Sequence, residues 1–327
     1  MATPALPDHK ILQEAAHWFA TLADEKASAE DRVQWQAWLN QHPDHHQAWQ
    51  YVEQVGQRFF TAQQQAGREN ASQIIRSTRQ RRIGRRQVLG GGAAGLAMWL
   101  VWRQTPLASV SQRLANSLSA DHHTTIGEQR QLILADGGQL WLNTATAVDI
   151  RYQETGRNIT LLDGEILIDT APDALQRSFV VHTPQGSLRA LGTRFAVQQQ
   201  SSRVLLAVYQ GAVEIRTQQG QFLTVQAGQQ STFSNSHIGK PQPADNARQA
   251  WANGLIIANH IPLRSLVDEL ARYRHGHLSV SPQVAELQVV GTYPTDQPDH
   301  ALAMLEATLP VKVERLFPWW VTITPEQ

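Results

Sequence analysis

The sequence predicts a multidomain protein with a small all-α bundle, one transmembrane helix, an all-β domain and a C-terminal α+β module. Apolar residues recur at helical spacing in the first 60 residues, alternate from about residue 126, and show both patterns in the last 75 or so residues. An uncharged, arginine-flanked run at residues 87–102 separates the first pattern from the second. We therefore expect a helical domain at 1–62, a basic linker at 63–86, the transmembrane helix at 87–103, a second linker at 104–122, a β-rich domain at 123–238 and the α+β module at 249–327.

The overall composition excludes several classes of function. The 327 residues contain 28 Lys plus Arg and 28 Asp plus Glu, so no net field attracts nucleic acid, and no direct nucleic-acid partner is expected. The chain has no cysteine, which excludes disulfides, thiol catalysis and cysteine-ligated metal sites.

The first domain is predicted to be an acidic helical bundle. Residues 1–60 carry eight acidic and four basic side chains. Apolar residues recur at helical spacing in three segments, with breaks near Ser28 and at Pro43, where Asp44 is a candidate N-cap. The aromatic content is high, which suits either a core or a protein-binding surface. Candidate binding residues are Trp18, Trp35, Trp38, Leu39 and Trp49. We interpret His42, His45 and His46 as ordinary histidines and expect no metal site.

The run at residues 87–102 is predicted to cross a membrane. As a helix it is roughly 24 Å long against a hydrocarbon core of roughly 30 Å, so it is a short span. Trp99 and Trp102 can anchor one interface, and arginines cluster before the run. The positive-inside rule then places the N-terminal part in the cytoplasm and exports the C-terminal part. The alternative for the arginine cluster is a nucleic-acid-binding patch.

The start of this run resembles a twin-arginine export signal. Arg85 and Arg86 precede Leu89 and a glycine-rich, weakly apolar segment. Residues 105–109 form a poor cleavage site, so we expect a retained anchor in the inner membrane.

From about Ile126 the pattern predicts many short strands joined by glycine-containing turns. Asp136-Gly137-Gly138 separates two alternating segments, and similar turns follow at Gly164, Gly211 and Gly228. This rhythm is typical of a β sandwich, barrel or roll.

The last 75 or so residues combine helices and strands. One helix is expected from Pro262 to about Gly276, followed by strands at 278–280 and 287–290. A second helix around residues 301–309 and two strands at 311–313 and 321–323 complete a compact α+β module.

Motifs for enzyme chemistry are absent from the sequence. It contains no nucleophile elbow, zinc-protease motif, phosphate-binding loop or dinucleotide fingerprint. Asp136, Asp163 and Glu165 lie at or beside tight turns, where we expect them to serve backbone geometry. No multiple-turnover enzyme activity and no cofactor are predicted.

Together these segments resemble the FecR family of transmembrane sigma-factor regulators. Residues 18–49 resemble its sigma-regulating domain. The β domain carries similar motifs at 134–137, 162–165 and 191–195, ending in Leu-Gly-Thr-Arg-Phe. Residues 287–293 resemble the short signalling module shared with secretins and TonB-dependent transporters.

The resemblance implies a relay across the cell envelope. A TonB-dependent siderophore transporter would present its signalling domain to the C-terminal half, and a periplasmic protease and a site-2 type intramembrane protease would then process the chain. The cytoplasmic piece would control an extracytoplasmic-function sigma factor, by inhibition or by activation. Candidate transporter contacts are Leu266, Leu270, Tyr293, Leu302 and Leu305.

The resemblance also implies chemistry at one peptide bond. Some relatives cut themselves between residues matching Gly192 and Thr193 by an N-to-O acyl shift, in which the threonine hydroxyl attacks the glycine carbonyl. The alternative is an ordinary turn between the strands 188–191 and 195–197.

Two other classes of function remain open in the sequence. A twin-arginine-exported enzyme would need a cofactor site in the β domain. A membrane-anchored polysaccharide- or cell-wall-binding protein would need an exposed aromatic platform, for which the candidates are Trp141, Trp251, Trp319 and Trp320.

Overall fold

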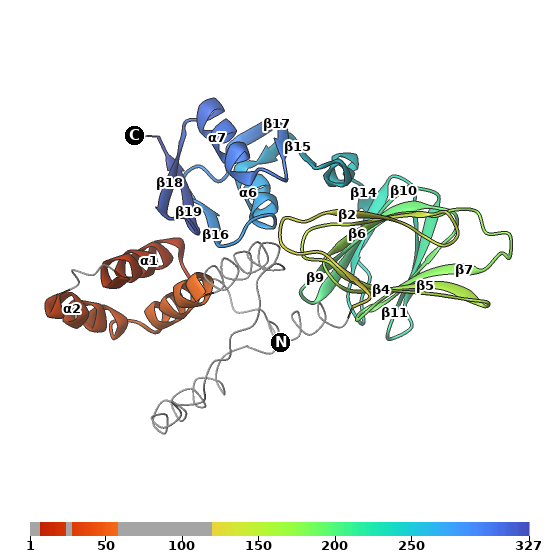
Figure 1. Cartoon of the computed structure of the whole chain (residues 1–327), viewed down its shortest axis with the longest axis horizontal. Coiled ribbons are helices and arrows are strands. Elements are labelled where there is room, and N and C mark those ends of the chain that lie inside the picture. Colours follow the sequence, from red (N-terminus) through yellow and green to blue (C-terminus); the bar gives the residue numbers. More distant parts are fainter. Residues whose placement is uncertain (1–6, 24–27, 58–119, 327) are drawn as a thin grey trace, which may run out of the picture.

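The N-terminal region is a bundle of three helices. The structure, a computed structural model, describes residues 7–23, 28–57 and 120–326 (Figure 1). Helix α1 covers His9–Ala23, α2 covers Ala29–Leu39, and a third helix covers residues 43–57. A capping box starts α2: the Asp31 N–H donates to the Ser28 hydroxyl over 3.1 Å, and the Ser28 N–H donates to the Asp31 carboxylate over 2.8 Å.

The third helix corrects one detail of the sequence analysis. It begins at Pro43, a residue whose fixed φ suits the first helical position. Asp44 therefore lies inside the first turn, and the predicted N-cap role for it is wrong. Its backbone N–H instead donates to Nδ1 of His42 over 3.2 Å.

The central domain is a sandwich of two seven-stranded sheets. The first sheet has the order β1 (His122–His123), β4 (Ala147–Gln153), β5 (Gly156–Asp163), β7 (Ser178–Thr183), β8 (Gly186–Ala190), β11 (Ala212–Thr217), β12 (Phe222–Gln226). The second has the order β14 (Gln242–Pro243), β13 (Gln229–Phe233), β10 (Arg203–Gln210), β9 (Arg194–Gln200), β6 (Glu165–Asp169), β3 (Gln139–Leu142), β2 (Arg130–Ile133). Strand β14 extends the sandwich past the expected end at residue 238.

Four glycines mark four of the points where the chain crosses from one sheet to the other. Gly164, Gly192, Gly211 and Gly228 join β5 to β6, β8 to β9, β10 to β11 and β12 to β13, and each pair of strands is split between the sheets. Their φ angles are +90°, +77°, +73° and +78°, in the left-handed region that glycine adopts without steric cost. The predicted turns at Gly164, Gly211 and Gly228 are therefore corners between sheets, whereas the predicted turn at Gly137 joins β2 to β3 within one sheet.

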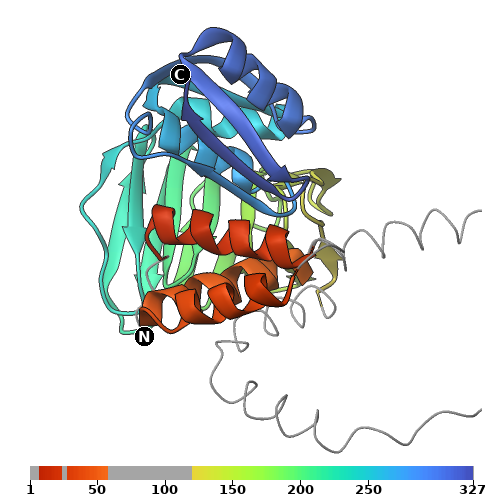
Figure 2. The same cartoon turned by 90° about the vertical axis from the view of Figure 1, so that its left-hand side faces the viewer.

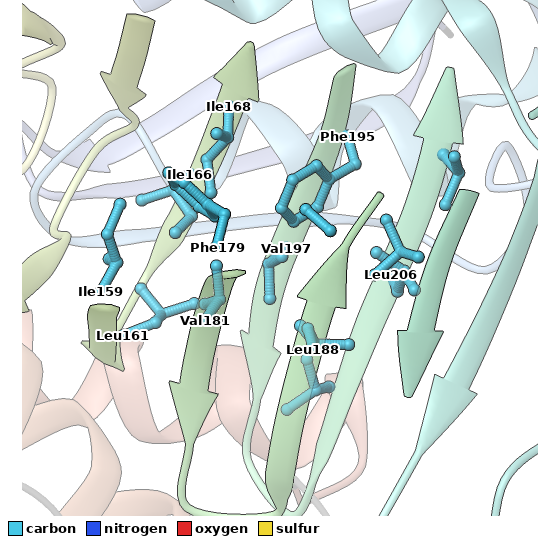
Figure 3. Packing of buried hydrophobic residues seen from close by; sticks show 14 of the residues in the cluster. Ile159, Leu161, Ile166, Ile168, Phe179, Val181, Leu188, Phe195, Val197 and Leu206 are labelled. Carbon is cyan, nitrogen blue, oxygen red and sulfur yellow. The ribbon is translucent and has the colours of Figure 1, made fainter. Parts of the chain in front are cut away.

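The core of the sandwich lies between the two sheets. Alternating residues of each strand point inward, and the fully buried side chains include Phe179, Phe195 and Leu188 (Figure 3). A second, smaller cluster forms on the outer face of the second sheet, where Trp251 packs against Leu167 and Ala196. Trp251 belongs to the 3₁₀ segment η2 (Asn246–Asn253), which leads into the last module.

The C-terminal module contains two small sheets and two helices. A two-stranded sheet pairs β15 (Leu255–Pro262) with β17 (Gln288–Pro294), and β15 is a strand that the sequence analysis missed. A three-stranded sheet has the order β16 (His277–Val280), β19 (Trp320–Pro325), β18 (Val311–Phe317). Helices α6 (Leu263–Ala271) and α7 (Pro298–Thr308) bury Leu266, Leu270, Leu302 and Leu305 against these strands. The predicted α+β order is otherwise present.

The helical bundle lies beside this module (Figures 1 and 2). Aromatic side chains of both parts share one buried cluster. The ring of Phe19 lies 5.9 Å from Phe317 and 5.6 Å from Trp319 between centroids. Tyr51 and Nδ1 of His277 lie within hydrogen-bond distance, at 3.2 Å. Burial lowers the pKa of His277 to about 4, with smaller contributions from His9 and Arg274. This imidazole is therefore neutral at neutral pH in the packed form.

The predicted membrane span lies outside the residues that the structure describes. Within residues 7–23, 28–57 and 120–326, no helix has the length and apolar character needed to cross a membrane. The predicted span at 87–103 and the export residues Arg85, Arg86 and Leu89 lie outside these ranges.

Candidate functional site

The Gly192–Thr193 peptide bond lies at the corner between β8 and β9. Gly192 is exposed, whereas Thr193 is only 3% exposed. The neighbouring corner packs directly against it, because a methyl group on Gly211 would overlap the carbonyl oxygen of Gly192. The absence of a side chain at residue 211 thus lets the two corners sit together and holds the Gly192 carbonyl in place.

The hydroxyl of Thr193 is buried without a hydrogen-bond partner among the described residues. Leaving a buried hydroxyl unpaired costs about 1–3 kcal/mol, so such groups are rare and call for an explanation. Its own backbone, by contrast, is fully engaged with Thr170. The Thr193 N–H donates to Oγ1 of Thr170 over 2.8 Å, and the Thr193 carbonyl accepts from the N–H of Thr170 over 3.0 Å and from its hydroxyl over 3.1 Å.

Arg194, the next residue, ties this corner to the start of the C-terminal module. Its Nε donates to the Gln249 side chain over 3.0 Å, and its guanidinium lies 5.3 Å from the centre of the Trp141 ring. A longer ion pair of 3.4 Å joins it to Asp169. None of the charged groups in the described residues forms a hydrogen bond with the Thr193 hydroxyl.

A second cluster joins the sandwich to the C-terminal module through a buried carboxylate. Glu165 is fully buried and forms ion pairs with Arg272 at 2.7 Å and Arg248 at 3.2 Å. Asn143 donates to it over 3.0 Å and in turn accepts from the Tyr273 hydroxyl over 3.0 Å. These contacts join β6 to η2 and to the end of α6, so the expectation that Glu165 serves turn geometry is wrong.

The charges around Glu165 decide its ionisation state. Burial alone would raise the pKa of Glu165, but Arg248 and Arg272, with hydrogen bonds from Arg272 and Asn143, hold that pKa below its usual value. Glu269, which pairs with Arg272 at 2.6 Å, has its pKa raised, mainly by burial. At neutral pH Glu165 is therefore a carboxylate shared by two arginines.

Asp136 and Asp163 follow the sequence prediction. The Gly138 N–H donates to Asp136 over 3.0 Å, and the Gly164 N–H donates to Asp163 over 2.9 Å. Asp136 also pairs with the buried Arg157 at 2.7 Å. Both carboxylates thus stabilise turns.

The candidate sigma-binding residues divide into two groups. Trp38 and Leu39 are 7% and 8% exposed and lie inside the bundle, where the Trp38 indole donates to Glu14 over 3.0 Å. Trp18, Trp35 and Trp49 are half-buried, and the rings of Trp35 and Trp49 lie 4.9 Å apart. Only the second group presents aromatic surface that a partner can contact in this conformation.

The histidines near the third helix have a structural role. The ring of His45 stacks on Trp38 with 4.4 Å between centroids, and its Nδ1 lies 2.6 Å from the Trp38 carbonyl. Across the described residues, no group of three His, Asp or Glu side chains is arranged to hold a metal ion.

The candidate transporter contacts lie inside the C-terminal module, not on its surface. Leu266, Leu270, Leu302 and Leu305 are 0% exposed and Tyr293 is 3% exposed. The helical spacing of the four leucines is the spacing of the module's own core. These side chains do not reach a partner in this conformation. Ile257 and Val290, on the paired strands β15 and β17, are exposed instead.

The proposed aromatic platform is also not exposed. Trp251, Trp319 and Trp320 are each 2% exposed, and Trp141 is half-buried beneath Arg194. Sugar-stacking surfaces need open aromatic faces, so these four residues do not supply one. The polysaccharide-binding alternative loses the feature that suggested it.

Comparison with known families identifies the class of protein. Residues 120–214 match the family model described as FecR protein, and residues 13–55 match the model described as Domain of unknown function (DUF4880). The chain therefore contains a FecR domain with a DUF4880 helical region ahead of it, and the resemblance of these two regions to the FecR family is confirmed.

Two solved structures show partial similarity to this chain. Both are crystal structures of a "putative anti-sigma factor" from Parabacteroides distasonis ATCC 8503, at 2.50 and 1.65 Å resolution. The first is 19% identical, with a TM-score of 0.49, and the match covers 63% of this chain and 98% of that one. The second is 20% identical, with a TM-score of 0.49, and covers 62% and 97%. No curated protein matches the chain.

Proposed function

We propose that this protein is a single-pass inner-membrane anti-sigma factor that relays occupancy of a TonB-dependent siderophore transporter to an extracytoplasmic-function sigma factor and so controls iron-uptake transcription. The order of the matched regions carries the proposal. A DUF4880 helical region at 13–55 precedes a FecR domain at 120–214, with an arginine-flanked apolar run between them. In this proposal the apolar run crosses the membrane, with the binding domain on one side and the sensing domain on the other.

The cytoplasmic partner would contact the helical bundle through Trp18, Trp35 and Trp49. Half-buried tryptophans supply large apolar contacts at protein interfaces, and the acidic surface of the bundle suits a partner with basic surfaces. Trp38 and Leu39 belong to the buried cluster of the bundle, so their role is to hold its helices together beneath this surface.

Capture from cells tests this assignment. A tagged full chain is expected to retain an extracytoplasmic-function sigma factor, identified by mass spectrometry. The double variant Trp35→Ala/Trp49→Ala is expected to lose it. Leu175→Ala is the matched control. It shortens a side chain on the FecR domain that is 69% exposed, and it is expected to keep binding the sigma factor. Equal capture by all three proteins would contradict the assignment.

The periplasmic partner in this proposal is the signalling domain of the transporter. It would bind the surface of the C-terminal module, where Ile257 and Val290 are open, and a periplasmic protease followed by a site-2 type intramembrane protease would then release the cytoplasmic part. Ile257→Glu/Val290→Glu is expected to abolish the transcriptional response to the siderophore while leaving the protein level unchanged on immunoblots. A normal response would exclude this face.

A single-turnover self-cleavage at Gly192–Thr193 is a second proposed activity, favoured by the buried and unpartnered Thr193 hydroxyl. The hydroxyl oxygen would attack the Gly192 carbonyl carbon, the C–N bond would break, and the hydroxyl proton would end on the released amine. Water would then hydrolyse the resulting ester, giving a new carboxyl end at Gly192. Gly192 is exposed, so water can reach that ester.

Fragment analysis tests the cleavage. Wild-type protein is expected to yield two pieces, one ending at Gly192 and one beginning at Thr193. Thr193→Ala is expected to stay intact, whereas Thr193→Ser keeps a hydroxyl and is cleaved. An unchanged fragment pattern in Thr193→Ala would rule out the acyl shift at this bond.

A further inference from the structure

Thr170 and Thr193 extend the hydrogen-bond ladder between β6 and β9, but one of their two bonds is irregular. Strands β6 and β9 are antiparallel partners up to the pair Asp169 and Arg194, so Thr170 and Thr193 form the next position. There the N–H of Thr170 donates to the carbonyl of Thr193, as a regular ladder requires. The return bond differs, because the Thr193 N–H donates to the side-chain hydroxyl of Thr170, at 2.8 Å, instead of to a backbone carbonyl.

This exchange changes the chemistry available to the Thr193 nitrogen. A backbone carbonyl can only accept a hydrogen bond, whereas a hydroxyl can accept one and also donate a proton. In an acyl shift that nitrogen is the leaving group, and it must gain a proton as the C–N bond breaks. The Thr170 hydroxyl, which carries a proton, therefore lies in contact with the Thr193 nitrogen, which needs one.

We propose that the Thr170 hydroxyl is the proton donor to the amide nitrogen of Thr193 in the self-cleavage reaction. The inference rests on the self-cleavage proposed above and names a residue that the sequence motif does not contain. Because Oγ1 of Thr170 touches the reacting nitrogen, Thr170 acts as a catalytic residue and not only as a support.

The acyl shift needs no external proton donor or acceptor. The Oγ1–C bond forms between Thr193 and Gly192, and the C–N bond breaks. Thr170 gives its hydroxyl proton to the nitrogen and regains one, directly or through water, from the Thr193 hydroxyl as that oxygen bonds to carbon. The net change is an isomerisation of amide to ester.

The local geometry favours this transfer. The Thr170 hydroxyl now donates to the Thr193 carbonyl over 3.1 Å while its oxygen accepts from the Thr193 N–H. When the Thr193 hydroxyl oxygen adds to the Gly192 carbonyl carbon, the nitrogen becomes pyramidal and gains a lone pair, which the turned Thr170 hydroxyl can protonate. The same residue fixes the Thr193 backbone through its own N–H, at 3.0 Å, which keeps the nitrogen in reach as the hydroxyl turns. Thr170 is half-buried, so bulk water competes only partly for its hydroxyl.

The test follows cleavage from the moment of synthesis, by cell-free translation of the full chain and mass spectrometry of the two fragments. Thr170→Val removes the hydroxyl at nearly constant shape and is expected to slow cleavage by about 100-fold or more, the usual size of a general-acid contribution. Thr170→Ser keeps a hydroxyl and is expected to remain near the wild-type rate. Thr170→Ala provides a second hydroxyl-free form if the valine variant folds poorly, and it is expected to be equally slow.

A matched control separates chemistry from stability. Thr183→Val removes a similar side-chain bond, from Oγ1 of Thr183 to the Gly186 carbonyl at 3.1 Å, on a strand of the other sheet, and is expected to cleave normally. Wild-type rates in folded Thr170→Val or Thr170→Ala, or a slow Thr170→Ser, would overturn the role of Thr170. Intact wild-type protein, or a cleaved Thr193→Ala, would instead overturn self-cleavage itself.

Discussion

Gly211 shows how one missing side chain positions the candidate bond. With φ at +73°, an alanine at this position is strained by about 1–2 kcal/mol, and its methyl group would also overlap the Gly192 carbonyl. The corner carrying Gly192 and Thr193 therefore depends on a residue 18 positions away from Thr193, which no local motif indicates.

Two glycine variants separate strain from overlap. Gly220 has a similar φ of +85° but open space where a methyl group would go. Gly220→Ala is expected to lose only the conformational cost, about 1–2 kcal/mol of unfolding free energy. Gly211→Ala is expected to lose more and to change the cleavage rate at Gly192–Thr193. Urea unfolding and fragment analysis measure both effects, and equal losses would show that the two corners do not depend on each other.

At the scale of elements, Glu165 connects β6 with η2 and with the end of α6. Replacing it by glutamine leaves Arg248 and Arg272 facing a neutral group. Breaking a buried ion pair costs about 3–5 kcal/mol, and the two arginine side chains are 25% and 23% exposed, which favours the lower end of that range. Glu286→Gln is the matched control, since its pair with Arg264 is exposed at the surface on both sides and contributes about 0–1 kcal/mol. Similar losses in both variants, measured by urea unfolding, would contradict the role assigned to Glu165.

The carboxylate of Glu165 is also expected to make the stability of the protein depend on pH. The pKa of Glu165 is lower in the folded protein than its ordinary value of 4.5, so its contribution to stability is complete above pH 4.5. That contribution is lost as the pH falls through the folded value, because the unfolded chain takes up the proton first. Glu165→Gln lacks this dependence. Urea midpoints of the two proteins are therefore expected to converge below pH 4.5, and a constant difference would contradict the assignment.

Sequence patterns predicted most elements but not how they pair. Alternation identified the strands and glycine identified the turns, yet neither says whether the next strand stays in the same sheet, as at Gly164 and Gly211. Strand β15 was missed because it is interrupted: its register shifts between Asn259 and Ile261, and His260 has a φ of +52°. A bulge of this kind breaks the period of two.

The candidate sites were predicted in part. The Gly192–Thr193 motif pointed to a corner that the structure contains, whereas Thr170 carries no motif and contributes only through its register opposite Thr193. Helical spacing in α6 and α7 marks a buried face without saying what buries it, so it could not show whether these leucines contact a partner or their own module. Here the module buries its own helices.

At the scale of the whole molecule, the contact between the bundle and the C-terminal module bears on topology. A span at residues 87–103 would hold the two on opposite sides of a membrane, where Phe19 cannot meet Phe317. The contact and the span therefore exclude each other in one molecule at one time. The packed form belongs to chains whose two ends share a compartment.

Cross-linking distinguishes the two forms. The chain has no cysteine, so Phe19→Cys/Phe317→Cys introduces the only thiols, at positions whose rings lie 5.9 Å apart. A short bis-maleimide is expected to join them in detergent-solubilised protein and to leave them unjoined in intact cells. Val33→Cys/Leu175→Cys, two exposed sites on the bundle and the sandwich, controls for random collisions. Efficient joining of residues 19 and 317 in intact cells would contradict the single-pass topology.

The central claim, that this protein regulates a sigma factor, is tested most directly by transcript profiles of three strains: one with the intact gene, one with the gene deleted and one expressing residues 1–86 alone. If the protein regulates a sigma factor, deletion alters one set of iron-uptake transcripts that share a sigma-dependent promoter. If the protein inhibits its sigma factor, these transcripts rise on deletion and fall again with the fragment. If it is needed for activation, they fall on deletion and rise with the fragment. Identical profiles in all three strains, under iron limitation and with siderophore present, would contradict the account.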